Sequence, residues 1–450
     1  MRSRTIPPTE VRSALGRTRR HIASRAFVLA FLIVASSALL MGQQPDGTPP
    51  ADKSGADKET VQLLLQRIDQ LEARVKQLES SKPEAHPAQA STTAPPAQET
   101  APSTTPSEPE TEPSSERTET ERMDVSRTLL RIRGFGDINF HGDNQKGDTT
   151  SFTLGQLNLF LTSDVSDKFR FIGEIVFEAD SLDNNFGVDV ERMLIQYSHS
   201  DYLKLAAGRY HTAIGYYNTA YHHSTWFQTT TGRPFLFQFE DGGGILPVHN
   251  VGVTATGLIP SGPLGLHYVA EVGNGRASRH PLTDEPVQNV VDENNHKAFN
   301  LALFARPEKI RGLQAGFSIY RDKLAPVGFP RIGETIVAAH AVYIHPNFEW
   351  LNEVLVVRHT PEGGHTFDTP GFYSQVSKRF GQYRPYFRYQ YVNGSDNEPV
   401  FPDVGLRHGP SVGLRFDASE SVALKLQYDY TMLRLKPSVS SLGLQVGFTF

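Results

Sequence analysis

The sequence predicts an all-β protein: a transmembrane antiparallel β-barrel of about 16 strands, preceded by a signal peptide, a short coiled-coil helix and a disordered linker. From residue 131 onward, short runs alternate apolar and polar residues, the period that is typical of half-buried strands. Short connections alternate with longer polar ones, as expected of tight periplasmic turns and long outer loops. The run at 440–450 has an apolar residue at every second position, and pairing it with the first strand would leave no open sheet edge.

The composition of the 450-residue chain excludes several classes of protein. Its net charge of −5 argues against a nucleic-acid partner, which would require clustered Lys and Arg. It has no cysteine, which excludes disulfides, thiolate metal sites and thiol catalysis. Its mean hydropathy is −0.37, a value that a barrel can share with a soluble protein because barrel strands alternate polar and apolar residues. We expect no cofactor and no bound metal.

The first segment, residues 1–42, is predicted to be a signal peptide for export. Basic residues up to Arg25 precede an uncharged apolar run at 26–42, the order of an n-region and an h-region. This run is shorter than the roughly 20 residues that a spanning helix requires. A polar stretch at 43–58, which we expect to be disordered, follows directly, so a retained membrane helix is the less favoured alternative.

Residues 59–81 are predicted to form a coiled-coil helix. Apolar residues recur there in steps of three and four, at Val61, Leu64, Ile68, Leu71, Val75 and Leu78. The alternative is a lone helix that packs on its own domain. Val or Ile at one core position with Leu at the other favours dimers, which conflicts with the trimer expected below. Residues 82–124, rich in Pro, Ser, Thr and Glu, have too few large apolar residues to fold and are expected to be a disordered linker.

The remaining residues, 125–450, are predicted to form the barrel. Candidate strands lie near 131–141, 151–163, 168–179, 189–198, 201–210, 250–259, 263–273, 297–306, 310–320, 334–345, 347–359, 367–380, 383–394, 406–418, 420–432 and 440–450. With an even number of strands, the first strand begins and the last strand ends on the same side of the membrane. The coiled coil and the linker would then lie in the periplasm.

The longest connection, between the candidate strands 201–210 and 250–259, is the third outer loop and the candidate functional site. It is too apolar for a free surface loop, so we expect it to fold into the barrel as a constriction. A cap over the mouth, or a contact with a neighbouring barrel, is the alternative. The predicted constriction residues are His222, His223, Trp226, Gln228, Arg233, Glu240 and Asp241. Arg233, whose loop neighbours are aromatic residues and glycine, is the strongest single candidate for a solute contact.

Inward positions of the strands are predicted to carry charges of both signs. The predicted basic lining residues are Arg170, Lys204, Arg209, Arg384, Arg388, Arg415 and Lys425. The carboxylates assigned to inward faces are Asp137, Glu174, Glu178, Glu271, Asp417 and Asp429. A salt bridge to a carboxylate on the next strand is the alternative role for each basic residue. Because rings of like charge are what select ions, a mixed lining predicts weak selectivity.

The stretch VERMLIQYSHSDYLKLAAGRYHTAIGYYN at 190–218 resembles the fourth and fifth strands of the phosphate-selective porin O and P superfamily, including its dicarboxylate-type members. Those porins share a strand, a short turn and a Gly-Arg or Gly-Gln step into the pore loop, which here is Gly208-Arg209, followed by Gly215. The resemblance covers most of 131–450 in rhythm and implies trimers of sixteen-stranded barrels. The chain departs from the family because its inward faces lack the dense Arg/Lys ladder of a phosphate pore.

We therefore expect an outer-membrane porin that gives passive, weakly selective diffusion of small hydrophilic solutes, with any preference directed to anions, carboxylates or phosphate. Its partners would be outer-membrane lipid, the barrel-assembly machinery, the permeating solutes and two further copies in a homotrimer of the bacterial outer membrane. The alternative function is a plugged barrel that ties the outer membrane to the cell wall through the coiled coil. Catalysis by Ser224 with His222, His223, His340 or His345 is disfavoured, because no spacing commits these residues to a site.

Overall fold

The computed structural model describes residues 129–180, 185–221, 225–239, 244–277, 291–326 and 329–450. The predicted signal peptide, disordered stretch, coiled-coil helix and linker lie outside these ranges. None of the helices within them is long and apolar enough to cross a membrane.

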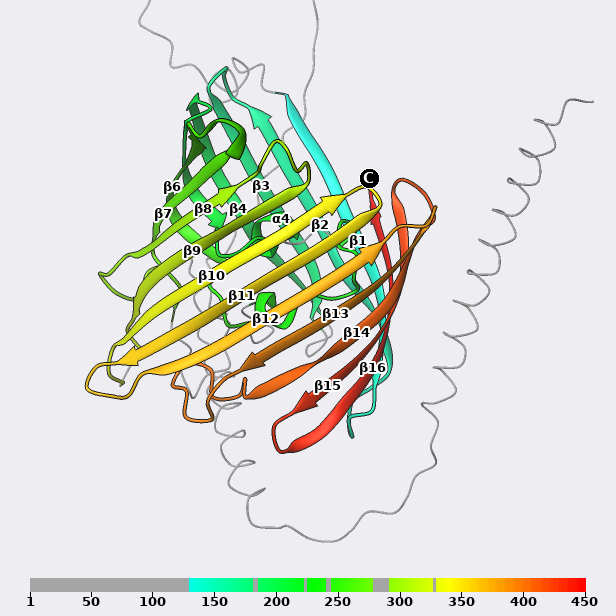
Figure 1. Cartoon of the computed structure of the whole chain (residues 1–450). Coiled ribbons are helices and arrows are strands. Elements are labelled where there is room, and N and C mark those ends of the chain that lie inside the picture. Colours follow the sequence, from blue (N-terminus) through cyan, green and yellow to red (C-terminus); the bar gives the residue numbers. More distant parts are fainter. Residues whose placement is uncertain (1–128, 181–184, 222–224, 240–243, 278–290, 327–328) are drawn as a thin grey trace, which may run out of the picture. The chain divides into compact units, whose positions relative to one another are not determined.

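Sixteen antiparallel strands form one closed barrel, in which each strand pairs with the next along the chain and β16 pairs with β1 (Figure 1). The strands are β1 (Leu130–Asp143), β2 (Ser151–Asp164), β3 (Phe169–Asp180), β4 (Asn185–Ser200), β5 (Leu203–His211), β6 (His249–Ile259), β7 (Leu266–Gly273), β8 (Ala298–Ala305), β9 (Leu313–Leu324), β10 (Ile332–His345), β11 (Phe348–Pro361), β12 (Phe367–Lys378), β13 (Tyr383–Asn393), β14 (Leu406–Asp417), β15 (Val422–Leu433) and β16 (Lys436–Thr449). The predicted fold class is confirmed, and every predicted strand is present with ends displaced by a few residues.

The last strand closes the barrel against the first. The backbone N–H of Gly134 donates to the carbonyl of Phe450 at 2.9 Å, and the N–H of Phe450 donates to the carbonyl of Gly134 at 3.0 Å. The rings of Phe448 and Phe450 lie over glycines of β1: a Cβ at Gly134 would meet the Phe450 ring at 2.1 Å, and one at Gly136 would meet Phe448 at 2.6 Å. Glycine on β1 therefore makes room for the aromatic residues of the closing strand.

Short and long connections alternate around most of the barrel. The short ones include 165–168, 201–202 and 346–347, and the longest are 212–248 and 274–297. The predicted alternation is not strict: the link between β3 and β4, which should be a long one, has four residues, 181–184, and the link between β15 and β16 has two, Arg434 and Leu435. Leu435 has a φ of 53°, the left-handed conformation that such a tight turn requires.

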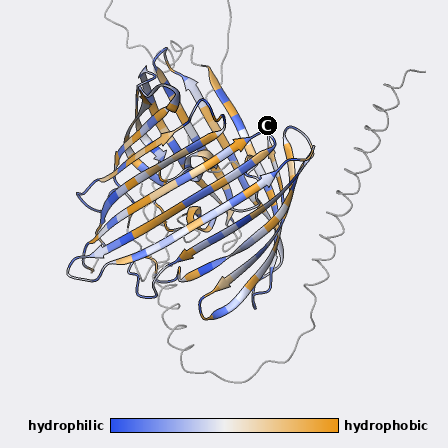
Figure 2. Ribbon diagram, in the orientation of Figure 1, coloured by the Kyte–Doolittle hydropathy of each residue, from blue (hydrophilic) through white to orange (hydrophobic). Residues whose placement is uncertain are grey.

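The outer face of the barrel is apolar. Side chains such as Phe299, Val337, Val354 and Val412 are about half exposed, with Val354 at 51%. Their neighbours along the strands face inward and are buried, and Figure 2 shows the resulting alternation of hydrophobic and hydrophilic positions. The alternation predicts which half of each strand can contact a nonpolar surrounding.

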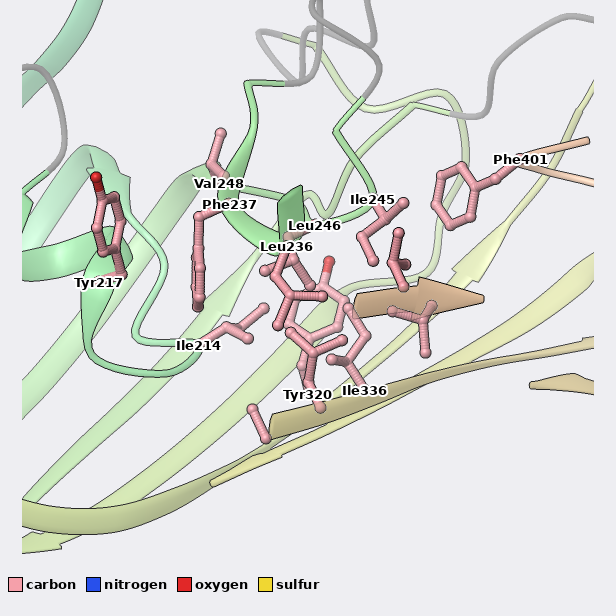
Figure 3. Close-up of a cluster of buried hydrophobic side chains, with 14 of the residues drawn as sticks. Ile214, Tyr217, Leu236, Phe237, Ile245, Leu246, Val248, Tyr320, Ile336 and Phe401 are labelled. Atoms are coloured by element: carbon pink, nitrogen blue, oxygen red, sulfur yellow. The ribbon is translucent and has the colours of Figure 1, made fainter. Parts of the chain in front are cut away.

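An apolar core fills part of the interior, beside β9 to β13. We call the described residues of the connection between β5 and β6, which are 212–221, 225–239 and 244–248, the inner segment. They contain the helix α4 (Tyr217–Tyr221) and the 3-10 turn η1 (Phe235–Phe237). A further 3-10 turn, η2 (Gly262–Leu264), lies between β6 and β7. Side chains of the inner segment pack on inward-facing side chains of the wall, as Figure 3 shows for Phe237, Leu246 and Ile336. Part of the inward face of the wall is therefore apolar and covered by protein. The inward positions of β10 and β11 include several large aliphatic residues, which are covered by the inner segment instead of by water.

Candidate functional site

The two ends of the inner segment are fixed to each other where they leave the wall. The N–H of Thr212 donates to the carbonyl of Val248 at 3.0 Å. The amide of Asn218, which is 1% exposed, donates to the carbonyls of Thr212 at 3.0 Å and Val248 at 2.9 Å. These bonds give the buried backbone the partners that it would otherwise lose on leaving water. The segment therefore enters and leaves the barrel interior at one point of the wall.

Carboxylates of the wall hold the first part of the inner segment by its N–H groups. Glu271 of β7 accepts from the N–H of Ala213 at 3.1 Å, and Glu353 of β11 accepts from Tyr216 and, at 2.9 Å, from Tyr217. Gly215 precedes this contact with a φ of 72°, and a Cβ there would meet Glu353 Oε2 at 2.3 Å. The glycine is therefore required both by the turn and by the close approach of the carboxylate.

Basic side chains from β13, β14 and β15 hold the second part of the inner segment by its carbonyls. Lys425 Nζ donates to the carbonyl of Thr230 at 3.0 Å, to that of Thr225 at 2.5 Å and to Gln445 Oε1 at 2.8 Å. Arg388 Nη1 donates to the carbonyl of Gly232 at 2.8 Å. Carbonyls in an irregular segment have no helix or strand partner, so these cations supply the donors that burial requires.

The third member of this basic set is Arg415 of β14. Its Nη1 donates to the carbonyls of Trp226 at 2.6 Å and Gln228 at 2.9 Å, while its Nε lies 2.7 Å from the carboxylate of Asp417. Arg388, Arg415 and Lys425 were predicted to line water or to form salt bridges between strands. The structure gives all three a further role, as anchors of the inner segment.

The other predicted lining residues lie in different surroundings. Arg170 pairs with Asp164 at 2.7 Å near a short turn, where both side chains are about half exposed. Lys204 is half-buried and lies opposite Ser198 and Thr256 in the ladder. Arg209 is buried and donates through Nε to the carbonyl of Glu191 at 3.3 Å; Arg384 Nη1 lies 4.0 Å from Glu349. The structure does not bring these four side chains together.

Three predicted constriction residues fall within the described part of the inner segment. Trp226 packs edge-on against Phe227, with ring centroids 4.9 Å apart, and Gln228 donates to the carbonyl of Tyr221 at 2.9 Å. The Arg233 guanidinium lies 3.9 Å from the Phe239 ring centroid and 5.5 Å from that of Tyr217, and its Nε donates to the carbonyl of Phe237. His222, His223, Glu240 and Asp241 lie outside the described residues.

One face of the helix α4 is buried, with Tyr217, Asn218 and Tyr221. Tyr217 is 1% exposed, and burial raises the pKa of its hydroxyl to about 12, although the Arg233 and Arg388 charges oppose this rise. The hydroxyl therefore stays neutral at any physiological pH. Its ring stacks on Phe237 with centroids 5.5 Å apart, which joins α4 to η1 inside the apolar core.

Cavities lie on both sides of the inner segment. The loop-side cavity, of about 480 Å³, is bounded by the segment and by β1, β2, β13, β15 and β16, close to the long connections. The turn-side cavity, of about 580 Å³, is bounded by Trp226, Phe227 and residues near the short turns 379–382 and 418–421. Thr225 and Gln228 line the first cavity. The four residues 225–228 therefore separate the two spaces.

A third cavity, of about 360 Å³, is also lined by Phe227. Its wall includes Arg131, Arg133 and Arg192, three arginines that were absent from the predicted site. Arg131 and Arg133 alternate with Leu130 and Ile132 at the start of β1, which is the pattern of inward and outward positions. The two-residue period of the strand could have identified both arginines as inward residues. The same period places Gln390 of β13, Gln427 of β15 and Gln445 of β16 on the inward face.

The residues considered for catalysis do not come together in the described ranges. His340 faces Gln314, with 3.1 Å between their Nε2 atoms, and its ring lies 5.9 Å from that of Tyr216. His345 is exposed at the end of β10. Ser224 lies outside the described residues. Among the residues that the structure describes, no group of three or more His, Cys, Asp or Glu side chains could hold a metal ion.

No family model matches the sequence, and no curated protein matches it. The fold is similar to that of an anion-selective porin from Comamonas acidovorans, with a TM-score of 0.52 and 14% identity over 72% of this chain and 100% of that one. It is also similar to the outer membrane channel DcaP of Acinetobacter baumannii, with a TM-score of 0.51 and 12% identity over 72% and 97%. Salmonella typhi OmpF, in complex with daunomycin, has a TM-score of 0.51 and 9% identity over 71% and 97%. At these identities the likeness is one of fold.

Proposed function

We propose that the protein is a porin of the bacterial outer membrane, through which small hydrophilic solutes diffuse passively and with weak selectivity. The single observation that carries this proposal is the closed barrel with an apolar outer face and with cavities on both sides of the inner segment. A membrane requires that every backbone polar group be paired, and closure of the sheet meets that requirement. The inner segment would be the constriction, with 225–228 at its narrowest part.

A weak preference for anions, including small carboxylates and phosphate, is part of this proposal. Arginines line the third cavity and the turn-side cavity: Arg131, Arg133 and Arg192 in the third, and Arg379, Arg384 and Arg415 in the turn-side one. Glu174, Asp417 and Glu420 lie among them, so the field is mixed. Cations at a pore mouth raise the local concentration of anions, but interspersed carboxylates and salt reduce this effect.

Membership of the phosphate-selective porin O and P superfamily and a homotrimeric state follow only from the sequence resemblance and are proposed on that basis. The signal peptide, the periplasmic coiled coil and recognition by the barrel-assembly machinery are proposed from sequence alone. Purification of a chain that starts near Glu121 would test what sets the oligomer. Trimers that persist without the coiled coil would show that the barrel alone is sufficient.

The second candidate is a plugged barrel that acts as a structural anchor. It is favoured by the apolar core beside β9 to β13, which occupies part of the interior. It differs from the porin in one respect that can be measured, which is the passage of ions.

Recording from purified protein in planar lipid bilayers distinguishes the two functions. A trimeric porin gives stepwise conductance in groups of three, whereas a plugged barrel inserts without any increase in current. Phospholipid turnover by the same preparation tests the enzymatic alternative, with Ser224→Ala as the control variant. Insertion without conductance would overturn the porin proposal.

A further inference from the structure

We infer that the loop-side cavity binds uncharged, polyhydroxylated solutes of the size of a small sugar; this inference rests on the proposed diffusion function. The cavity, of about 480 Å³, falls within the range of about 300–1,000 Å³ that is usual for pockets that bind small molecules. Its wall combines amide side chains with aromatic rings. Which solute suits it depends on the groups that remain able to contact a guest.

The cations around this cavity are engaged with the protein itself. Arg388 is 2% exposed and Lys425 is fully buried, and both donate to carbonyls of the inner segment. The guanidinium of Arg233 lies over the rings of Tyr217 and Phe239, and its Nε donates to a backbone carbonyl. Within the described residues, the wall therefore presents no set of convergent cationic donors of the kind that binds phosphate or a dicarboxylate.

Carboxylates, in contrast, face the same space. Asp137 of β1 and Asp429 of β15 both line the cavity. Asp137 accepts from Asn139 Nδ2 at 2.6 Å and from Gln445 Nε2 at 3.1 Å, and Asp429 accepts from Gln427 Nε2 at 2.9 Å. An anionic guest would be repelled by both carboxylates at short range.

The polar groups that dominate the wall are amides. Gln390, Gln427 and Gln445 line the cavity but are buried and bonded to other groups of the protein. Asn139, Thr431 and Ser441 line it as well and are only half-buried, so their amide and hydroxyl groups can contact a guest. An amide carries both donors and acceptors, as a sugar hydroxyl does, whereas an anion can only accept. The wall is therefore complementary to a guest that donates and accepts at many positions.

Aromatic residues supply the apolar part of the wall. Phe235 and Phe239, on either side of η1, are half-buried and line the cavity. Sugars have C–H faces that pack on aromatic rings, and pockets for small molecules commonly join such apolar surfaces to a few fixed polar groups. The wall therefore lacks the convergent cations of an anion site. It has the aromatic rings and the donor and acceptor groups that a neutral polyol requires.

Blocking of the ion current by a solute tests the inference. Maltose or glucose added on the side of the long connections should reduce single-channel conductance in a saturable manner, whereas succinate and inorganic phosphate at equal concentration should not. Conductance that is unaffected by sugars but reduced by succinate or phosphate would overturn the inference and leave the porin proposal intact. Absence of any conductance would instead overturn the porin proposal.

A pair of matched variants localises the effect. Asn139→Leu removes an amide from the cavity, and loss of one hydrogen bond should raise the half-blocking sugar concentration about fivefold. The same substitution in an exposed loop, Asn397→Leu, should leave it unchanged. A second variant, Gly443→Leu, keeps the test available if Asn139→Leu does not fold. A Cβ at Gly443 would lie 3.4 Å from Thr231 Oγ1, so a leucine there fills the cavity and should abolish sugar block. Equal sugar block in the wild type and in both cavity variants would overturn the inference.

Discussion

The two halves of the barrel interior differ in what covers their inward faces. Beside β9 to β12, inward residues such as Ile336, Leu351 and Leu355 are buried against the inner segment in a dry core. Beside β14 to β16 and β1, inward residues such as Lys425 and Gln445 bind the segment through hydrogen bonds, and Gln445 also borders the loop-side cavity. The same fold thus holds one segment by hydrophobic burial on one side and by polar contacts on the other. Any path for solutes must follow the polar side.

Two sets of wall side chains hold opposite groups of the inner segment. Carboxylates Glu271 and Glu353 accept from its N–H groups, whereas Arg388, Arg415 and Lys425 donate to its carbonyls. The wall therefore carries inward groups of both signs, but each set is engaged with backbone. This explains why a count of inward charges overstates the charge that a passing ion would meet.

Removing a side chain from the dry half should have the largest effect on stability. Phe237 is fully buried, and its ring lies 6.1 Å from that of Tyr373. Phe237→Ala should lower the free energy of unfolding by about 3–5 kcal/mol, because it leaves a cavity in a packed core. Urea unfolding from lipid vesicles measures this change. Phe387→Ala, on the half-exposed outer face, is the control, and an equal loss there would contradict the contrast between the halves.

Removing an anchor from the polar half should have a smaller effect on stability and a larger one on current. Lys425→Met leaves the carbonyls of Thr225 and Thr230 without their donor, at a cost of about 1–3 kcal/mol. The second part of the inner segment would then be held less firmly, and single-channel current should become noisier and larger. Lys436→Met, at an exposed position, serves as control. Unchanged current in Lys425→Met would show that these carbonyl contacts do not set the constriction.

Reversing the charge at Arg233 tests whether the path runs past the polar half. Arg233→Glu should shift the reversal potential under a salt gradient toward cation selectivity, because Arg233 lines the loop-side cavity. The exposed loop residue Lys146 receives the same change, Lys146→Glu, as control. If the two variants give the same reversal potential as the wild type, Arg233 has no contact with the path.

The smallest effect is expected from a single exposed arginine at the turn side. Arg133→Ala should reduce the preference for anions slightly, and only at low ionic strength, because salt screens exposed charges. Measurement of the reversal potential at two salt concentrations tests this. Arg311→Ala, in an exposed short turn, is the matched substitution. A large effect of Arg133→Ala at high salt would contradict the exposed position that the structure gives to Arg133.

The fold could be predicted from the sequence because the strand signal is local. Alternation in runs such as VALKLQYDY at 422–430 identifies a strand and its two faces without any knowledge of its neighbours. The site could be predicted only in part. That 212–248 enters the barrel follows from its many apolar residues, but its contacts with Arg388 and Lys425 join positions more than 150 residues apart. No local pattern encodes such a pairing.

The sequence by itself determined the strands, their number and their closure, because a two-residue period and turn residues are properties of neighbouring positions. Only the tertiary structure decided which inward faces are dry. In β10, Ile336 and Val337 are both apolar, and one lies in the core while the other is 48% exposed on the outer face. The physical reason is that an aliphatic side chain is stabilised equally by the inner segment or by a nonpolar surrounding. Which of the two covers it depends on where a distant segment packs.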